Sequence, residues 1–315
     1  MNREVTPDKF NLAAIDIGSN AARILIKQVT CTKTGDGLTT LRMKKLQFLR
    51  IPLRLGIDVF SIGKISKERE KQLIRTIKVF RQLMTIYDVL DYRACATAAF
   101  RDAKNGRRIL RHICKDMKVD IDIITGDEEA RILRDCNRAV VGNLLYMDVG
   151  GGSTEISLVC DGQLIDSRSF NIGTLRLLSG ATSKADWESM KDEVYGMCRG
   201  FDNIQIVGSG GNINKLFRLT PKSERGAERL AVSSVAKLYE DLSALSVERR
   251  MEQYDLREDR ADVIVPAARL FLMVAEVARA ETIMVPTVGL ADGLINELAE
   301  GVLTPSFAGP CSAPR

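Results

Sequence analysis

The stretch LLYMDVGGGSTEISLV, residues 144–159, runs from an apolar segment through an acid, three glycines, two hydroxyl residues and a second acid into another apolar segment. Plain hairpins manage with a short Asn-Gly or Gly-X turn, and glycine loses the most backbone freedom on ordering. Successive glycines let backbone N–H groups converge on an anion. We therefore expect phosphate to bind at Gly150, Gly151, Gly152, Ser153 and Thr154. An ordinary flexible hairpin turn is the alternative.

Two carboxylates flank this loop. Asp148 precedes the glycines, and Glu155 follows the two hydroxyl residues. Carboxylates beside a phosphate site are consistent with a hard divalent cation that bridges protein and phosphate. We expect Mg²⁺ in this position, with Mn²⁺ as the alternative.

An earlier stretch repeats the pattern. AAIDIGSNAARILI (13–26) and LYMDVGGGSTEISLV (145–159) share an apolar strand, an acid, a glycine turn and a second apolar strand, with Asp16 and Asp148 in equivalent places. We infer a duplicated α/β domain with a ligand in the cleft between the copies, where small-molecule sites are common. By analogy, we expect the first turn, Gly18, Ser19 and Asn20, to contact phosphate as well.

The spacing of apolar residues predicts the other elements. Strands are expected at 38–51, 92–99, 119–125, 162–172, 203–208 and 282–286. Helices are expected at 66–87, at 100–117 with a break at 105–106, from about 127, at 186–200, up to about 280, and at 290–300. In IVGSGGNINKL (206–216), Gly210 and Gly211 lead from a strand into a helix, whose free N–H groups form an anion site. A simple glycine-rich connection is the alternative there.

Composition limits the class of protein. The chain has 315 residues, a net charge of +5 and seven cysteines without a CxxC pair, so we expect a cytoplasmic protein with reduced thiols. The charge is too small to indicate nucleic-acid binding, and no apolar run is long enough for a membrane span. The single histidine, His112, excludes a histidine-cluster metal site. Hydrolytic chemistry must therefore depend on carboxylates.

Three further segments allow both a functional and a structural interpretation. The acids of TGDEEAR (125–131) either cap a helix or act in a site. Arg101 follows a strand, where open α/β sheets place ligand contacts, so we expect it to bind phosphate; a solvated surface arginine is the alternative. Residues 37–57 hold five lysines and arginines, which form either a solvated strand face or an electrostatic entry for a polyanion.

Taken together, these motifs resemble the exopolyphosphatase/guanosine pentaphosphate phosphohydrolase (Ppx/GppA) family of the actin-like ATPase and sugar-kinase superfamily. The matching pieces are AIDIGSN, ATAAFRDAKN, ITGDEEAR, YMDVGGGSTEISLV, IVGSGGNI and REDRADVIVPAARL. The resemblance implies an α/β fold of two ribonuclease-H-like domains with an active-site cleft between them. We expect the first domain at 1–126, completed by the helix 290–304, the second at 127–289, and a disordered tail at 305–315.

The resemblance also implies roles. Glu129, the second glutamate of the EEAR motif, orients or deprotonates the attacking water. Asp148 and Glu155 hold the metal, and Asp16 is a further acid facing the cleft. Arg23 and Arg260 fall on arginines associated with phosphate or guanosine tetraphosphate.

The expected reaction is Mg²⁺-dependent hydrolysis of terminal phosphoanhydride bonds of inorganic polyphosphate. A guanosine pentaphosphate 5′-phosphohydrolase and a guanosine tetraphosphate-binding regulator with little turnover are the alternatives. The chain departs from the family pattern at Ala21, Asn212 and Ala291, and it ends before the C-terminal helical domain of long members, as in the short two-domain form. No nucleic-acid or membrane partner is expected, and a homodimer is left open.

Overall fold

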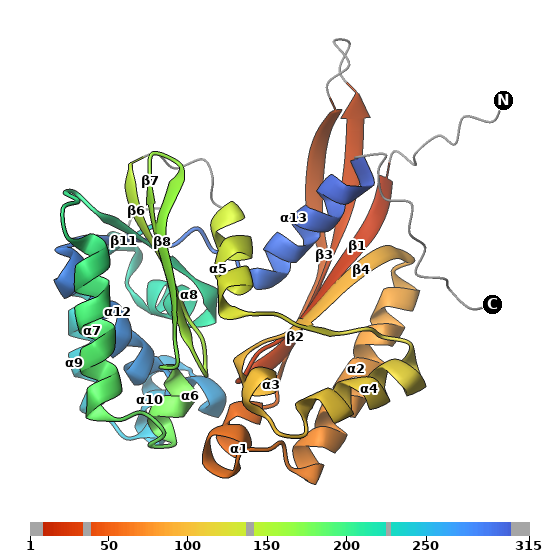
Figure 1. Cartoon of the computed structure of the whole chain (residues 1–315), viewed down its shortest axis with the longest axis horizontal. Coiled ribbons are helices and arrows are strands. Elements are labelled where there is room, and N and C mark those ends of the chain that lie inside the picture. The colour runs from red at the N-terminus through yellow and green to blue at the C-terminus, as the bar shows by residue number, and fades with distance from the viewer. Residues whose placement is uncertain (1–8, 34–38, 137–141, 225–227, 304–315) are drawn as a thin grey trace.

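Two α/β halves stand side by side in the computed structural model, each built around its own sheet (Figure 1). The structure describes residues 9–33, 39–136, 142–224 and 228–303. The tail expected at 305–315 lies outside the described residues. Within them, no helix is both long enough and apolar enough to cross a membrane.

The first sheet has five strands in the order β3-β2-β1-β4-β5. Its strands are β1 (Lys9–Ile17), β2 (Ala21–Lys33), β3 (Thr39–Pro52), β4 (Val89–Ala96) and β5 (Asp122–Ile123). The first three are antiparallel neighbours, whereas β4 runs parallel to β1 and β5 parallel to β4. Strands β2 and β3 extend beyond the rest of the sheet as a long hairpin (Figure 1).

The second sheet has six strands in the order β10-β11-β9-β6-β7-β8. They are β6 (Asn143–Val149), β7 (Thr154–Cys160), β8 (Gln163–Phe170), β9 (Gln205–Ser209), β10 (Arg229–Ala231) and β11 (Thr282–Met284). Strands β6, β7 and β8 form an antiparallel meander, β9 runs parallel to β6, and β11 runs parallel to β9. Apart from β10, this order repeats that of the first sheet, which confirms the duplicated α/β fold inferred from the two related stretches.

Helices cover both sheets. In the first half they are α1 (Leu55–Ile62), α2 (Lys67–Ile86), α3 (Ala98–Asp102) and α4 (Gly106–Met117). Helix α5 (Gly126–Asp135) lies between the sheets (Figure 1). The second half contains α6 (Thr174–Leu178), α7 (Lys184–Cys198), α8 (Gly210–Leu219), the 3-10 turn Lys222–Glu224, α9 (Val232–Ser243), α10 (Val247–Tyr254), α11 (Glu258–Ala261) and α12 (Ile264–Ala278). The last helix is α13 (Leu290–Leu303).

The central strand β1 shows why both faces of the first sheet are covered. Ala13, Ile15 and Ile17 pack into a core shared with α1 to α4, whereas Leu12 and Ala14 pack into a second core shared with α5 and α13. This alternation follows from the period of two along a strand. Since α13 packs on the first sheet, we propose that it completes the first domain, with the domain limits given above.

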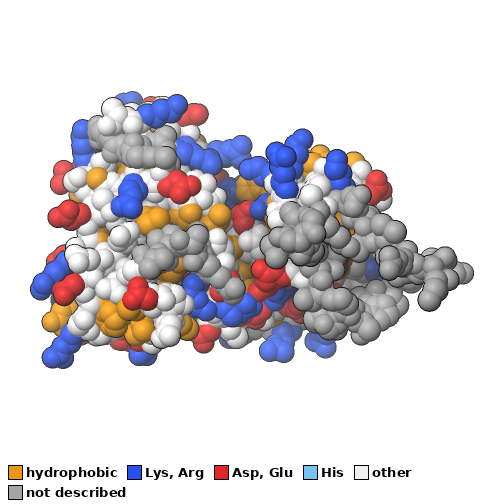
Figure 2. All heavy atoms as spheres, turned by 90° about the horizontal axis from the view of Figure 1, so that it is seen from above, with side chains coloured by type: hydrophobic (Ala, Val, Ile, Leu, Met, Phe, Trp, Pro, Cys, Tyr) orange, Lys and Arg blue, Asp and Glu red, His pale blue; other side chains and the backbone are white. Residues whose placement is uncertain are grey.

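The junction between α5 and α13 carries charges of both signs. Arg131 on α5 pairs with Glu297 on α13 at 2.8 Å, and Arg93 on β4 pairs with Glu128 on α5 at 2.7 Å. Seen from above, lysine, arginine and acidic side chains gather where the two halves meet (Figure 2). Ion pairs therefore accompany apolar packing in holding α5 to the first half.

Several short elements were not predicted from the sequence, and several boundaries were placed differently. Strand β4 spans Val89–Ala96 rather than 92–99, and β5 spans Asp122–Ile123 rather than 119–125. Helices α1 and α6 and strand β10 have 8, 5 and 3 residues, too few for a clear apolar period. The predicted loop around Gly210 does not exist as a separate segment, because β9 ends at Ser209 and α8 begins at the next residue. The expected break in the helix at 105–106 is confirmed by the gap between α3 and α4.

Candidate active site

The two related turns meet face to face, one from each half. A Cβ on Gly151 would lie 2.9 Å from the Cβ of Ser19, and a Cβ on Gly152 would lie 2.6 Å from the Phe60 ring. Real Cβ atoms do not come so close to other atoms, so these glycines allow the halves to touch. The main chain of Gly151 and Gly152 is thus approached closely by residues from the other half of the protein.

The carbonyl groups of the glycine turn face helix α6. The N–H groups of Thr174 and Leu175 donate to the carbonyls of Gly150 and Gly151 at 3.0 and 2.8 Å. Arg176 Nε donates to the Gly152 carbonyl at 2.8 Å. The N–H groups of Gly151 and Gly152 make no hydrogen bond within the described part of the chain, so no protein acceptor there competes with an anion for them.

The hydroxyl residues of the two turns differ in availability. Thr154 is fully buried and donates to the Ile172 carbonyl at 2.6 Å, so its hydroxyl serves the loop itself. Ser153 donates to Glu155 at 2.6 Å and accepts from Arg101 at 3.2 Å. Ser19 Oγ and Asn20 Oδ1 are buried without a hydrogen-bond partner among the described residues. These two atoms are available to a ligand.

Three acids come together beside these turns: Glu129, Asp148 and Glu155 each offer an oxygen within 4.8 Å of the others. Glu129 lies in the first turn of α5, and the other two residues face each other across β6 and β7. Gly126 lets α5 approach this hairpin, because a Cβ there would lie 2.2 Å from Ser169 Oγ on β8. The cluster therefore depends on the close packing of α5 against the second sheet.

Burial raises the pKa of all three carboxyl groups, and repulsion from neighbouring acids raises it further at Glu129 and Asp148. Desolvation is the main cause of the raised pKa of Glu129, followed by the charges of Glu155 and Asp148. The pKa of Asp148 rises to about 7, first through desolvation and then through Glu155. Desolvation also raises the pKa of Glu155, against hydrogen bonds from Ser153 and Ser169 and the charge of Arg101. A nearby cation would stabilise the ionised cluster.

The donor set fits a hard divalent cation. Residue Asp148 keeps some contact with solvent, but its Oδ1 is buried and has no hydrogen-bond partner within the described residues. The cluster offers only carboxylate oxygens, which Mg²⁺ prefers to nitrogen or sulfur ligands. A buried carboxylate oxygen without a partner, on a residue that clusters with two further acids, is what a cation would be expected to satisfy.

Asp16 lies beside this cluster but outside it. It occupies the position of Asp148 in the first copy, and the residue opposite it across the hairpin is Arg23, where the second copy has Glu155. Asp16 forms an ion pair with Arg23. Its charge still contributes to the raised pKa values of Glu129 and Asp148. The same motif therefore places an ion-paired acid, Asp16, in the first half. In the second half it places Asp148 and Glu155, which belong to an acid cluster that could hold a metal ion.

Arg101 joins the acid cluster to the first half. Its guanidinium lies 3.3 Å from the carboxylate of Glu129 and 3.7 Å from that of Glu155. It also donates to the Ile124 carbonyl at 2.9 Å. Arg101 is therefore a half-buried cation in contact with two acids rather than a solvated surface arginine.

A second group of arginines lies where α11 meets the first half. Arg50 pairs with Asp259 at 2.5 Å, and the charges of Arg50 and Arg23 act on Arg260. Burial, followed by these two arginines, lowers the pKa of Arg260 to about 9. Because a phosphate would relieve this repulsion, the predicted phosphate ligands Arg23 and Arg260 lie in a suitable electrostatic setting.

Gly210 and Gly211, the first residues of α8, connect these arginines to the acids. A Cβ on Gly210 would lie 2.1 Å from Asp148 Oδ1, and one on Gly211 would lie 2.5 Å from the Arg260 guanidinium. Asn212 accepts from Arg260 at 3.0 Å and donates to the Val149 carbonyl at 2.8 Å. These two glycines leave space for Asp148 and Arg260 beside the start of α8.

The helix-capping interpretation of Glu129 is not supported by the geometry. Thr125 is the N-cap of α5, and its side chain accepts from the N–H of Glu128 at 3.1 Å. Glu128 points to the surface and pairs with Arg93, whereas Glu129 is 8% exposed and faces the other acids. Neighbouring residues of one motif therefore have different environments.

Sequence reasoning missed residues that hold the two halves together. Arg176 pairs with Asp102 at 2.5 Å, and its guanidinium lies 4.2 Å from the centre of the Phe60 ring. In the basic segment 37–57, Arg50 and Arg54 pair with Asp259 and Asp262, so they are not free surface cations. No sequence signal identifies such partners, because they lie more than 70 residues away.

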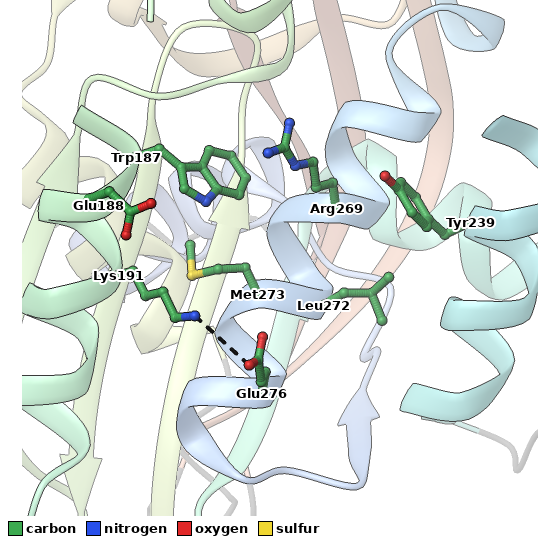
Figure 3. Close-up of a pocket in the computed structure, with 8 residues that line it drawn as sticks. All are labelled: Trp187, Glu188, Lys191, Tyr239, Arg269, Leu272, Met273 and Glu276. Carbon is green, nitrogen blue, oxygen red and sulfur yellow. Dashed lines mark ion pairs between the residues drawn. The ribbon is translucent and has the colours of Figure 1, made fainter. Parts of the chain in front are cut away.

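Another hollow lies between α7, α9 and α12 in the second half (Figure 3). It has a volume of about 300 Å³, Arg269 stacks 4.3 Å above the Trp187 ring, and Lys191 pairs with Glu276 at 3.8 Å. Its lining includes neither the three clustered acids, Glu129, Asp148 and Glu155, nor any predicted phosphate ligand. We therefore do not assign this hollow to the reaction.

Comparison with known proteins identifies the family. The Ppx/GppA phosphatase family matches residues 36–301. Exopolyphosphatase 1 of Mycobacterium tuberculosis is 26% identical over 309 residues, which cover 91% of this chain and 87% of that protein. A bifunctional 3-dehydroquinate synthase/phosphatase of Fusobacterium nucleatum is 30% identical over 178 residues, 54% of this chain and 26% of that protein.

Solved structures share the fold. An exopolyphosphatase from Cytophaga hutchinsonii has a TM-score of 0.79 at 22% identity, covering 92% of this chain and 98% of that chain. The Aquifex aeolicus member of the Ppx/GppA family has a TM-score of 0.71 at 23% identity, covering 93% of this chain and 99% of that chain. The actin-like ATPase fold expected from the sequence is thereby confirmed. With the family match over most of its length, the chain belongs to the Ppx/GppA phosphatase family and is a phosphoanhydride hydrolase.

Proposed function

We propose that the protein hydrolyses the terminal phosphoanhydride bonds of inorganic polyphosphate in a metal-dependent reaction that releases orthophosphate. The observation that carries the proposal is the buried cluster of Glu129, Asp148 and Glu155, set directly beside a glycine turn with free N–H groups. Acids suited to a metal and donors suited to a phosphate thus lie together where the two halves meet. The related exopolyphosphatases support polyphosphate as the substrate.

Asp148 and Glu155 are the proposed Mg²⁺ ligands, with Asp16 as a further candidate and Mn²⁺ as an alternative ion. When bound, the ion would neutralise charge on the phosphate oxygens. Asp148 has an unpartnered, buried Oδ1, whereas Asp16 is already paired with Arg23. We therefore rank Asp148 and Glu155 ahead of Asp16.

Glu129 is the proposed general base. Its carboxylate would accept a proton from the attacking water as that water forms a bond to the terminal phosphorus. A base works best when its pKa is near the operating pH, and burial beside two acids moves the pKa of Glu129 in that direction. Arg101, at 3.3 Å, keeps this carboxylate oriented.

The remaining ligands neutralise the phosphate chain. The free N–H groups of Gly151 and Gly152 are placed for the terminal phosphate, and the arginines around Arg260 are placed for further phosphate groups. The leaving group is itself a stable phosphate chain, so positioning and charge neutralisation supply most of the catalysis.

The substrate proposal is tested by comparing phosphate release from long polyphosphate, tripolyphosphate and guanosine pentaphosphate at equal concentration. We expect the highest kcat/KM for a polyphosphate. A clear preference for guanosine pentaphosphate would replace this substrate with the nucleotide, and binding of guanosine tetraphosphate without turnover of any substrate would identify a regulator.

A cytoplasmic location is also proposed. Its support is that the six cysteines in the described ranges are all free, including the buried Cys95 and Cys198. Reduced thiols are the usual state in the cytosol.

A further inference from the structure

A basic cavity adjoins the proposed active site on the side of Glu129. It has a volume of about 400 Å³ and lies between helices α3 and α4 and the segment that leads into α5. Its lining residues are Phe100, Arg101, Ala103, Lys104, Arg107, Ile123, Ile124 and Thr125. Three of them are cations and none is an acid, so the cavity favours an anion.

Two of these cations are unneutralised. Lys104 and Arg107 are exposed, and neither forms an ion pair with any acid in the described ranges. The next residue, Arg108, differs, because it pairs with Glu70 at 2.6 Å. The unpaired cations at Lys104, just before α4, and at Arg107, in its first turn, are therefore the ones that line the cavity.

Arg101 lies between the cavity, which it lines, and the acid cluster, which it contacts. One guanidinium nitrogen contacts both the Ile124 carbonyl at 2.9 Å and Glu129 at 3.3 Å, and the other contacts Ser153 at 3.2 Å. Thr125, which lines the cavity, is one helical turn before Glu129, and its carbonyl accepts from the Glu129 N–H at 3.0 Å. The cavity and the proposed base thus share the same short stretch of α5.

The reaction itself assigns a side to each product. In phosphoryl transfer the attacking and leaving oxygens are roughly in line. The water oxygen forms the new P–O bond, the bond to the chain breaks, and Glu129 takes one proton. Orthophosphate, which carries the water oxygen, is then formed on the Glu129 side, and the shortened chain with its bond electrons stays on the opposite side.

We propose that the cavity lined by Arg101, Lys104 and Arg107 is a binding site for the orthophosphate product. This inference rests on the proposed hydrolysis and adds a separate exit for its product. Phosphate would move past Arg101 toward the two free cations while the chain stays at the arginines around Arg260. Product release would then not require the chain to dissociate.

The test is calorimetric titration of inorganic phosphate into the protein with EDTA present, so that no turnover and no metal contribute. We expect the Lys104→Ala/Arg107→Ala double variant to raise the Kd about tenfold, which corresponds to about 1.4 kcal/mol, because two charge contacts to the phosphate are lost. Arg108→Ala is the matched control on the same helix and should leave the Kd unchanged. Unchanged melting temperatures would confirm that the variants fold.

An unchanged Kd in the double variant would overturn the proposal. A loss of phosphate binding in Arg260→Gln but not in the double variant would also overturn it, because phosphate would then bind at the other arginine group. In turnover assays, the inhibition constant of orthophosphate should rise more than the KM for polyphosphate. An equal rise in both would assign the cavity to the chain instead. If the protein binds phosphate in this cavity but does not hydrolyse polyphosphate, the proposed substrate is wrong, whereas the proposed anion site at Lys104 and Arg107 is supported.

Discussion

Replacing Glu129 with glutamine separates catalysis from structure at the proposed base. Glutamine keeps the size of the side chain and can still meet Arg101, but it cannot accept a proton. Loss of a general base lowers kcat by about 10²–10⁴. We therefore expect Glu129→Gln to reduce the rate of phosphate release at least about a hundredfold while polyphosphate binding remains near that of the wild type.

The structure limits the effect of this change on stability. Thr125 already caps α5, so helix α5 itself loses only the dipole contribution of a first-turn acid, about 0.3–1 kcal/mol. In metal-free protein the change can even stabilise, because the Glu129 pKa is raised by burial and by Glu155 and Asp148. A raised pKa means that the acid favours folding at low pH and that this contribution is lost as the pH rises. A neutral glutamine avoids that loss.

The assay is single-turnover phosphate release, with polyphosphate affinity and thermal melting measured on the same samples. Glu128→Gln is the matched control, because Glu128 lies one residue away and pairs with Arg93 at the surface. It should stay within a few-fold of wild-type activity, since its partly exposed ion pair with Arg93 is not part of the acid cluster and pairs near the surface contribute about 0–1 kcal/mol. If both variants keep their activity, or if both lose it equally, Glu129 is not the water-activating residue.

Three further changes test the metal site, the basic hairpin and the glycine turn. The pKa of Asp148 is raised from 3.8 to about 7, so in EDTA its favourable contribution is lost as the pH rises through about 7. Asp148→Asn should therefore melt above the wild type at pH 8 and near it at pH 4, and added Mg²⁺ should stabilise only the wild type; equal melting curves would refute the assignment. Lys44 and Lys45 are exposed on β3, so their joint reversal to glutamate should raise the KM of long polyphosphate more than that of tripolyphosphate, in a salt-sensitive way. If the KM values of long polyphosphate and tripolyphosphate change equally, Lys44 and Lys45 only form a solvated face of β3. Arg176→Lys loses the Nε bond to the Gly152 carbonyl, so kcat should fall about 10–100-fold with little change in melting temperature, and full activity would show that this bond does not position the turn.

The fold could be read from the sequence because its signals are local. The apolar residues of β1 alternate between two cores, and this alternation appears directly in the string AAIDI. The repeat of an acid before a glycine turn predicted the duplication that the strand orders of both sheets now show. Short elements such as α6 were not predicted, because five residues are too few to show a helical period of apolar residues.

The candidate site could be predicted only in part, because the contacts that define it join residues far apart in the sequence. The acids of the cluster could be named from their motifs, but the sequence alone does not show that Asp16 is neutralised by Arg23 while Asp148 faces Glu155. Likewise, Arg50 belongs to a run of cations that suggests a solvated face, yet its partner Asp259 lies 209 residues away. Composition indicates which charges exist, whereas only the packing of the halves decides which of them remain free.

The glycine turn shows how one motif can serve two purposes. Its missing Cβ atoms are required by Ser19 and Phe60 from the other half, so close packing alone explains why Gly151 and Gly152 are glycines. Their carbonyls, however, are held by α6, and their N–H groups remain without partners within the described residues. The same turn that brings the halves together therefore also leaves two backbone donors without a partner in the described residues. A substitution at either glycine would disturb the packing and the proposed phosphate site at once, so the informative changes lie at Arg176, which orients the turn without occupying its space.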